Sequence, residues 1–186
     1  MHNIYIVGFM GTGKSSVGCF LASSKQSHRP EGRGLFSSKQ SQWYFVDLDE
    51  LIELRQERRI VDIFAKYGEP YFRKIEKKTL KELSSQDNLV LACGGGIVLD
   101  KDNIKLMKKT GILICLTATP KEILKRVSKD THRPLLNVKN PLKRIELLLK
   151  MRAPYYMQAD RIIDTSNLSI KQVAQKIFKI SSLKKR

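Results

Sequence analysis

The stretch Gly8-Phe9-Met10-Gly11-Thr12-Gly13-Lys14-Ser15 matches the phosphate-binding pattern G-x-x-x-x-G-K-[ST]. A short apolar run rich in β-branched residues, Ile4 to Val7, precedes it, and a helical pattern starts at Lys14. A strand, a glycine-rich turn and a helix in this order let backbone N–H groups surround phosphate oxygens at a helix N-terminus. A chance glycine-rich turn is the alternative, but such a turn would need neither a strand before it nor a helix after it. The stretch therefore predicts a nucleotide phosphate site.

Within this loop, the residue types suggest separate roles. Lys14 is expected to reach the β- and γ-phosphates of the nucleotide, and Ser15 is expected to ligate Mg²⁺. The contacts expected from the loop to ATP come from Gly11, Thr12, Gly13, Lys14, Ser15 and Ser16.

Apolar runs and helical spacing alternate along the rest of the chain. Further strands are predicted at 44–46, 89–92, 112–116 and, more weakly, 161–163. Helical spacing follows at 72–83 and 142–149, and helix starts are expected at Thr119-Pro120 and at Ser169 with Gln172. Strands that are apolar almost throughout and separated by helices indicate an α/β fold, with a parallel sheet between two helical layers.

Size and composition limit the class of protein. A chain of 186 residues with 41% hydrophobic and 28% charged residues is expected to form one globular domain, 1–186. The net charge of +17 favours anionic partners. The three cysteines form no Cys-x-x-Cys pair, and residues 1–10 carry no secretion signal, so we expect a reducing, cytoplasmic location without membrane segments.

Three segments depart from the alternating pattern. Residues 23–42 are polar and contain the direct repeat Ser-Ser-Lys-Gln-Ser, which starts at Ser23 and again at Ser37, so we expect an inserted flexible loop. Residues 129–141, around Arg133-Pro134, are predicted to form a lid between two helices. Residues 181–186 form a basic tail.

Acidic residues and a paired arginine predict an acceptor site. Asp47 and Asp49 follow a predicted strand, where alternate residues face the same side; one could hold Mg²⁺ and the other could accept a hydroxyl proton, although either could simply cap a helix. Arg73 and Glu76 lie one helical turn apart and can pair, either as a surface salt bridge or to orient the guanidinium.

Glycines and two further arginines extend this candidate site. Gly94, Gly95 and Gly96 directly follow a predicted strand, which favours a ligand that approaches the backbone closely over a plain turn. Arg152 continues a buried helical stripe and needs an anionic partner, which could be a ligand or a structural carboxylate. Arg133 could close over a phosphoryl group or remain an ordinary loop charge.

An absent motif and the length of the chain exclude several classes of phosphate-loop protein. The guanine-reading Asn-Lys-x-Asp motif is absent, which counts against a GTPase, and the chain is too short for a helicase or a transporter ATPase. A small-molecule kinase needs only a phosphate loop, an acceptor site and a lid.

Taken in order, these motifs resemble the shikimate kinase family. The matching stretches are GFMGTGKS at 8–15, DLD at 47–49, FRKIE at 72–76, GGG at 94–96, RPLL at 133–136 and RAPYY at 152–156. The resemblance implies a P-loop kinase fold with a five-stranded parallel sheet. It also implies transfer of the ATP γ-phosphoryl group to the 3-hydroxyl of shikimate, giving shikimate 3-phosphate and ADP on the route to chorismate and aromatic amino acids.

The resemblance also assigns roles to individual residues. It implies that Asp49 binds the shikimate hydroxyls and acts as the base, that Arg73 and Arg152 clamp the carboxylate, and that Asp47 and Ser15 hold Mg²⁺. The backbone at Gly94, Gly95 and Gly96 approaches the ring, Lys14 and Arg133 neutralise the phosphates, Arg126 stacks on adenine, and the loop 164–167 edges the other face of adenine. Cys93 departs from the family, because many members have Ser or Thr there.

Rival functions remain open at this point. The lysines at 101, 105, 108 and 109 and the tail Leu183-Lys184-Lys185-Arg186 could bind nucleic acid, but no RNA-binding signature or aromatic ladder accompanies them. Two other functions are considered: the chain could be a kinase of another small hydroxy acid, or the insertion could have left it without activity. We expect shikimate and ATP as small-molecule partners of a monomer that binds neither nucleic acid nor membrane.

Overall fold

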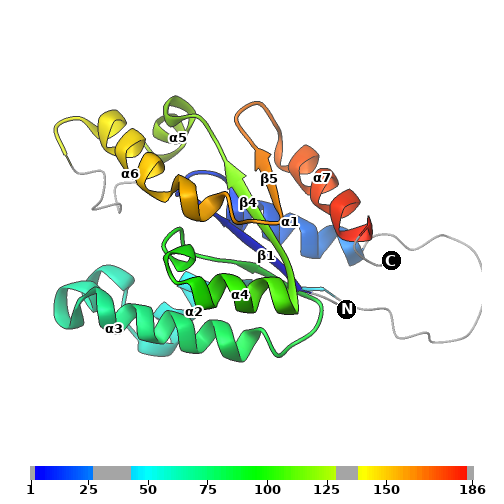
Figure 1. Ribbon diagram of the computed structural model, residues 1–186, viewed down its shortest axis with the longest axis horizontal. Coiled ribbons are helices and arrows are strands. Elements are labelled where there is room, and N and C mark those ends of the chain that lie inside the picture. The colour runs from blue at the N-terminus through cyan, green and yellow to red at the C-terminus, as the bar shows by residue number, and fades with distance from the viewer. Residues whose placement is uncertain (1–2, 27–42, 129–137, 184–186) are drawn as a thin grey trace, which may run out of the picture.

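The computed structural model describes residues 3–26, 43–128 and 138–183 (Figure 1). The predicted loop 23–42 and lid 129–141 lie mostly outside these ranges, as do Arg133 and the charged end of the tail 181–186. These predictions, and that of a single domain over 1–186, stay predictions. Within the described ranges, no helix has both the length and the apolarity to cross a membrane.

The centre of the molecule is a five-stranded parallel sheet, as predicted. Its strands are β1 (Asn3–Gly8), β2 (Tyr44–Asp47), β3 (Leu89–Ala92), β4 (Gly111–Thr117) and β5 (Arg161–Asp164). Their order across the sheet is β2-β3-β1-β4-β5, with Ile6 paired to Ala92 on one side and Ile114 on the other. The strands β2 and β3 thus lie on one side of β1, and β4 and β5 lie on the other side. Connections that run in opposite directions from β1 leave a crevice at the carboxyl ends of the central strands.

Side chains that alternate along β1 feed two different cores. Ile4 and Ile6 pack with the helices α1 (Lys14–Gln26) and α7 (Ile170–Leu183) on one face. Tyr5 and Val7 pack with α2 (Leu48–Gln56), α3 (Ile60–Leu83) and α4 (Lys101–Thr110) on the other face. Figure 1 shows these helices on opposite sides of the sheet. The predicted three layers follow from this two-sided burial.

A third core supports the phosphate loop. Phe9, directly after β1, is 1% exposed and packs with Ile123 of α5 (Pro120–Val127) and Ile145 of α6 (Pro141–Tyr156). The short helix η1 (Ile97–Leu99) follows the three glycines after β3. The loop is therefore held from beneath by apolar side chains rather than by polar contacts alone.

Helix α3 is longer than predicted and is broken inside. Gly68 has φ 79° and ψ 169°, and Pro70 follows it, so the segment consists of two helices that meet at a kink. The positive φ of Gly68 is a shape that favours glycine, and Pro70 has no backbone N–H to bond to the preceding turn, so the two residues together account for the break. The predicted stripe at 72–83 is the second of these helices, and it carries Arg73 and Glu76 towards the sheet.

Both predicted helix starts are confirmed. The Thr119 hydroxyl accepts from the Glu122 backbone N–H at 3.3 Å, and Pro120 is the first helical residue. Ser169 Oγ accepts from Gln172 N at 3.3 Å, while Gln172 Oε1 accepts from Ser169 N at 2.8 Å, a reciprocal capping box.

We expect Thr119→Ala to lower the free energy of unfolding by about 1 kcal/mol, because one N–H at the start of α5 loses its acceptor. Urea unfolding at equilibrium measures the change. A loss smaller than about 0.3 kcal/mol contradicts the assigned cap, since exposed sites away from such features rarely change stability by more than a few tenths.

Candidate active site

The phosphate loop joins β1 to α1 through backbone shapes that favour glycine. Gly11 and Gly13 have φ values of 75° and 90°, in the left-handed region. A Cβ on Gly8 would lie 2.2 Å from the Leu116 carbonyl oxygen of the neighbouring strand, so only glycine fits there. The loop is pinned by the Thr12 hydroxyl, which donates to the Phe9 carbonyl at 2.8 Å. This geometry leaves the helix N-terminus of α1 open towards the crevice.

Asp47 caps a helix and also contacts the phosphate loop. Its Oδ1 accepts from Asp49 N at 3.0 Å and Glu50 N at 3.4 Å, so it caps α2. Its Oδ2 accepts from the Ser15 hydroxyl at 2.5 Å. The cap therefore orients the carboxylate, and the free half of that carboxylate meets the phosphate loop.

Asp49 is a carboxyl group held out of water. Burial, with a smaller contribution from the charge of Asp47, raises its pKa to about 6, although Lys14 and Arg73 act in the opposite direction. A Cβ on Gly94 would lie 2.8 Å from Asp49 Oδ1. The first of the three glycines thus makes room for this carboxyl group, whose raised pKa suits a proton acceptor near neutral pH.

Arg73 is fixed by two carboxylates. Nη1 donates to Glu76 Oε2 at 2.7 Å, while Nε and Nη2 donate to Glu69 Oε1 at 3.1 and 2.9 Å. The Glu76 side chain is only 1% exposed, so the predicted pair is not a surface salt bridge. The guanidinium also lies over the Phe72 ring, 5.2 Å from its centroid. Its direction is therefore set by its own helix before any ligand binds.

The other two glycines let arginines approach the backbone. A Cβ on Gly96 would lie 2.3 Å from Arg73 Nη2, and one on Gly95 would lie 3.1 Å from Arg152 Nη1. Tyr156, one helical turn after Arg152, donates its hydroxyl to the Gly95 carbonyl at 2.9 Å. At Gly95 and Gly96, the guanidinium groups thus lie so close to the backbone that they leave little or no room for a methyl group.

We expect Gly96→Ala to raise the KM of a carboxylated acceptor about tenfold or more, because Arg73 must leave its present position and a charged hydrogen bond is worth about 1.5–3 kcal/mol. The KM of the nucleotide serves as the internal control and should change by less than about twofold, since the phosphate loop is untouched. Steady-state kinetics with each substrate varied in turn measures both, and equal changes in the two constants contradict this placement of Arg73.

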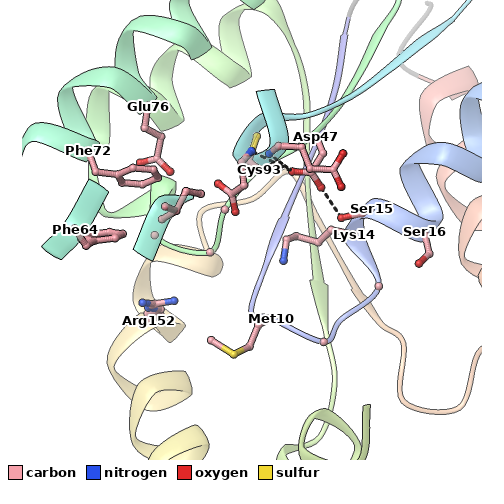
Figure 2. A pocket seen from close by; sticks show the side chains of 18 of the residues that line it. Met10, Lys14, Ser15, Ser16, Asp47, Phe64, Phe72, Glu76, Cys93 and Arg152 are labelled. Carbon is pink, nitrogen blue, oxygen red and sulfur yellow. Dashed lines mark hydrogen bonds between the residues drawn. The ribbon is translucent and has the colours of Figure 1, made fainter. Parts of the chain in front are cut away.

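One cavity of about 610 Å³ joins these groups. Its lining includes Gly11, Gly13, Lys14, Ser15, Ser16, Asp47, Asp49, Arg73, Cys93, Gly94, Gly95, Gly96, Arg126 and Arg152. Figure 2 shows Lys14, Ser15 and Asp47 together at one end, with Phe72, Glu76 and Arg152 towards the other. Guanidinium groups from α3, α5 and α6 thus share a cavity with a phosphate loop, and such an arrangement suits a kinase of an anionic acceptor.

Comparison with known proteins agrees with this arrangement. The family profile described as "Shikimate kinase" matches residues 33–181. A shikimate kinase of Thermodesulfovibrio yellowstonii is 42% identical over 179 residues, which are 96% of this chain and 94% of the relative. The chain belongs to the shikimate kinase family. The predicted resemblance is confirmed, and the chain is a member of a phosphotransferase family.

Solved shikimate kinases share the fold as well. The shikimate kinase from Acinetobacter baumannii in complex with shikimate is 36% identical, with a TM-score of 0.85 over 100% of this chain and 95% of that one. The enzyme from Aquifex aeolicus is 30% identical, with a TM-score of 0.73 over 98% of this chain and 96% of that one. The predicted P-loop kinase fold is therefore confirmed.

Arg126 lies at the far side of the shikimate kinase phosphate loop. Its Nη1 donates to the Gly11 carbonyl at 3.2 Å and to Thr165 Oγ1 at 3.0 Å, and its Nη2 donates to the Thr165 carbonyl at 2.8 Å. A second cavity, of about 440 Å³, is lined by Arg126, Thr165, Ser16 and Leu168 among others. Arg126 therefore ties the phosphate loop to the loop after β5, where the base of a nucleotide is expected.

Several site residues escaped the sequence analysis. Glu69 lies four residues before Arg73, a helical pairing distance, but the helical stripe was predicted only from residue 72 onward. The Tyr156 contact with Gly95 joins segments that are 61 residues apart, and no local spacing predicts it. Cys93, in contrast, was already noted from the sequence as a departure from the shikimate kinase family; it is 1% exposed, and burial raises the pKa of its thiol well above the ordinary value.

Proposed function

We propose that the chain transfers the γ-phosphoryl group of ATP to the 3-hydroxyl of shikimate. The observation that carries this proposal is the single cavity that contains Lys14 with the phosphate loop and also Arg73, Arg152 and Asp49. Membership of the shikimate kinase family supports the choice of substrates. A carboxylated and polyhydroxylated acceptor uses all of these charges, because it needs cations for its carboxylate and an acceptor for its hydroxyl proton.

For shikimate, the proposed contacts divide the cavity. Arg73 and Arg152 bind the carboxylate, and their guanidinium groups suit a planar two-oxygen partner. Asp49 binds the reacting hydroxyl, with backbone contacts from the loop at 94–96. Binding in this way places the hydroxyl towards the phosphate loop and keeps it from rotating, which is the main contribution that a kinase makes to phosphoryl transfer.

The proposed chemistry transfers one phosphoryl group and one proton. The hydroxyl oxygen of shikimate forms a bond to the γ-phosphorus, and the bond from that phosphorus to the β–γ bridging oxygen breaks, which releases ADP. Asp49 accepts the hydroxyl proton as the new ester forms. Lys14, and Arg133 if the lid brings it over the site, stabilise the charge that develops on the phosphoryl oxygens.

The oxygens of Ser15 and Asp47 fit Mg²⁺. They lie 2.5 Å apart at the phosphate loop, and no group of three His, Cys, Asp or Glu side chains within the described ranges forms a metal cage. Mg²⁺ typically takes one or two protein oxygens and completes its shell with water and phosphate. The ion would be bound by Ser15 and Asp47, and when bound it neutralises charge on the β- and γ-phosphates.

The remaining parts of the proposal concern the nucleotide base and the partners. Gly11, Thr12, Gly13, Lys14, Ser15 and Ser16 bind the ATP phosphates, and Arg126 supports adenine beside the loop 164–167. The chain acts as a cytoplasmic monomer without nucleic acid or membrane partners. These last statements rest on composition and stay predictions.

A coupled assay of ADP release tests the proposed function. With ATP and Mg²⁺ present, we expect turnover only when shikimate is added, and release of shikimate 3-phosphate in equal amount. Hydroxy acids without the ring hydroxyls, and cyclic polyols without the carboxylate, form the control panel. ADP release that does not depend on shikimate, or a faster reaction with another acid of the panel, overturns the assignment.

A further inference from the structure

The two oxygens of the Glu76 carboxyl group lie in different environments. Oε2 accepts from Arg73 Nη1 at 2.7 Å. Oε1 is buried and has no hydrogen-bond partner among the residues that the structure describes. The side chain is 1% exposed, so it is shielded from bulk water. A buried carboxylate oxygen without a donor is unfavourable, whereas a protonated oxygen carries no charge that needs one.

Charged groups of both signs and neutral polar groups surround Glu76. Glu69 precedes it on α3, Asp49 faces it from α2, and the Cys93 thiol lies at the end of β3. Asn103 of α4 lines a neighbouring hollow with Glu76, and its Oδ1 also has no partner within the described ranges. The same hollow includes Asp100 and Lys101, and Lys14 and Arg152 line the main cavity.

Burial raises the pKa of Glu76 to about 7, and the charges of Asp49 and Glu69 act in the same direction. Arg73 opposes them through its charge and its hydrogen bond. The pair is therefore balanced close to neutral pH, so that a small change in the surroundings of Arg73 changes how much of Glu76 is ionised.

We propose that Glu76 is a positioning residue that holds a proton on Oε1 when the acceptor binds, so that the charge of Arg73 is available to the acceptor carboxylate. This inference rests on the proposed function. When both Glu69 and Glu76 are ionised, two carboxylates share one guanidinium, and the surplus negative charge repels an anionic acceptor. Glu69 is 58% exposed and screened by water, so the ionisation of the buried Glu76 has the larger effect.

Proton linkage gives the sign of the effect. Because the acceptor binds better when Glu76 is protonated, acceptor affinity decreases as the pH rises through about 7. When only the protonated form binds the acceptor, the Kd rises about tenfold from pH 6 to pH 8. Binding of the acceptor in turn raises the pKa of Glu76. ATP affinity should not follow this change, since Glu76 does not touch the phosphate loop.

Calorimetric titration with shikimate, without nucleotide, tests the inference in wild type, Glu76→Gln and Glu69→Gln. A glutamine at 76 keeps an oxygen for Arg73 and places an N–H where the proton would be. We expect Glu76→Gln to bind shikimate about as tightly as wild type does at low pH, with no change near pH 7. Glu69→Gln is the matched control, because it removes a charge from the same arginine but leaves the buried carboxyl group, and it should keep the pH dependence.

A second measurement needs no variant. In protein with ¹³C-labelled glutamate side chains, we expect the Glu76 carboxyl resonance to titrate near pH 7 and its midpoint to rise when shikimate is saturating. A midpoint below about pH 5, the range of ordinary carboxyl groups, overturns the inference, as does a fall in the midpoint on binding. Glu76→Gln that keeps the wild-type pH dependence, or weakens binding tenfold at every pH, also overturns it. If wild type binds no shikimate at any pH, the proposed function fails; if it binds with a flat profile near pH 7, only the role of Glu76 fails.

Discussion

Lys14→Met is expected to lower kcat/KM for phosphoryl transfer about a thousandfold. Lys14 lines the cavity at the start of α1, and its Nζ lies 3.2 Å from the Phe9 carbonyl, inside the phosphate loop. Methionine keeps most of the side-chain length but carries no charge. Removing one group that stabilises transition-state charge lowers kcat by about 10²–10³, and a cation on the transferring phosphoryl group contributes at least as much.

The effect of Lys14→Met should appear mainly in kcat, because the charge grows as the phosphoryl group moves. Steady-state kinetics with ATP varied at saturating shikimate separates kcat from KM. Lys105→Met is the matched control: Lys105 is exposed on α4, and its loss should change kcat/KM by less than about twofold. Thermal unfolding of both variants checks the fold. A Lys14→Met enzyme within tenfold of wild type contradicts the role given to this lysine.

The three central strands β1, β3 and β4 could be predicted from the sequence because they are buried on both faces. Such strands are apolar at every position, so their limits are visible as the limits of an apolar run. The strand at 89–92 was predicted with its observed bounds; β2 and β5 are one residue longer at one end than predicted, and β1 and β4 are one residue longer at both ends. The phosphate loop was equally readable, since its function requires glycines and a lysine at fixed positions rather than a particular packing.

Contacts between distant elements could not be predicted in the same way. The spacing of Arg73 and Glu76 predicted a pair, but not that Glu76 is buried, because burial depends on how α3 packs against η1 and α4. The predicted helical stripe began at residue 72, so the pairing of Glu69, just after the break at Gly68, with Arg73 was not predicted. For Asp47, a helix cap and a site residue were treated as alternatives, yet its two oxygens do one task each.

The position of Arg152 depends on the same kind of long-range packing. A helical stripe predicted its direction, and the structure brings its guanidinium over the Phe9 ring, 5.6 Å from the centroid. Phe9 belongs to the phosphate loop, so the loop supports the arginine as well as the nucleotide. The order of motifs along the chain indicated one site; only the fold explains why one aromatic side chain joins its two halves.

Asp49→Asn is expected to lower kcat by about 10²–10⁴ while shikimate still binds, since this is the usual contribution of a general base. Asparagine keeps the shape and can still hydrogen-bond to a hydroxyl group, but it does not accept the proton. A coupled assay gives kcat, and calorimetry with shikimate gives the Kd. Asp62→Asn, an exposed carboxylate at the start of α3, is the matched control and should keep kcat within about twofold.

The pH profile shows whether Asp49 accepts a proton or only positions the acceptor. The ionised form is the active base, and burial raises its pKa to about 6, so kcat of wild type at saturating shikimate should rise with pH through about 6 and then level off. In Asp49→Asn, the remaining activity should lose this rise. A residual rate that still climbs near pH 6 contradicts the base role, because another group would then be titrating.

The two carboxyl groups of the site that have a raised pKa can be distinguished by experiment, because their deprotonation changes kcat/KM in opposite directions. Deprotonation of Asp49 near pH 6 increases the rate of transfer, whereas deprotonation of Glu76 near pH 7 weakens acceptor binding. Wild type should therefore show a bell-shaped kcat/KM for shikimate, Asp49→Asn should lose the acidic limb, and Glu76→Gln should lose the basic limb. With shikimate saturating, kcat should keep only the acidic limb, because saturation removes the dependence on binding. A basic limb that survives in kcat would assign that titration to the chemical step.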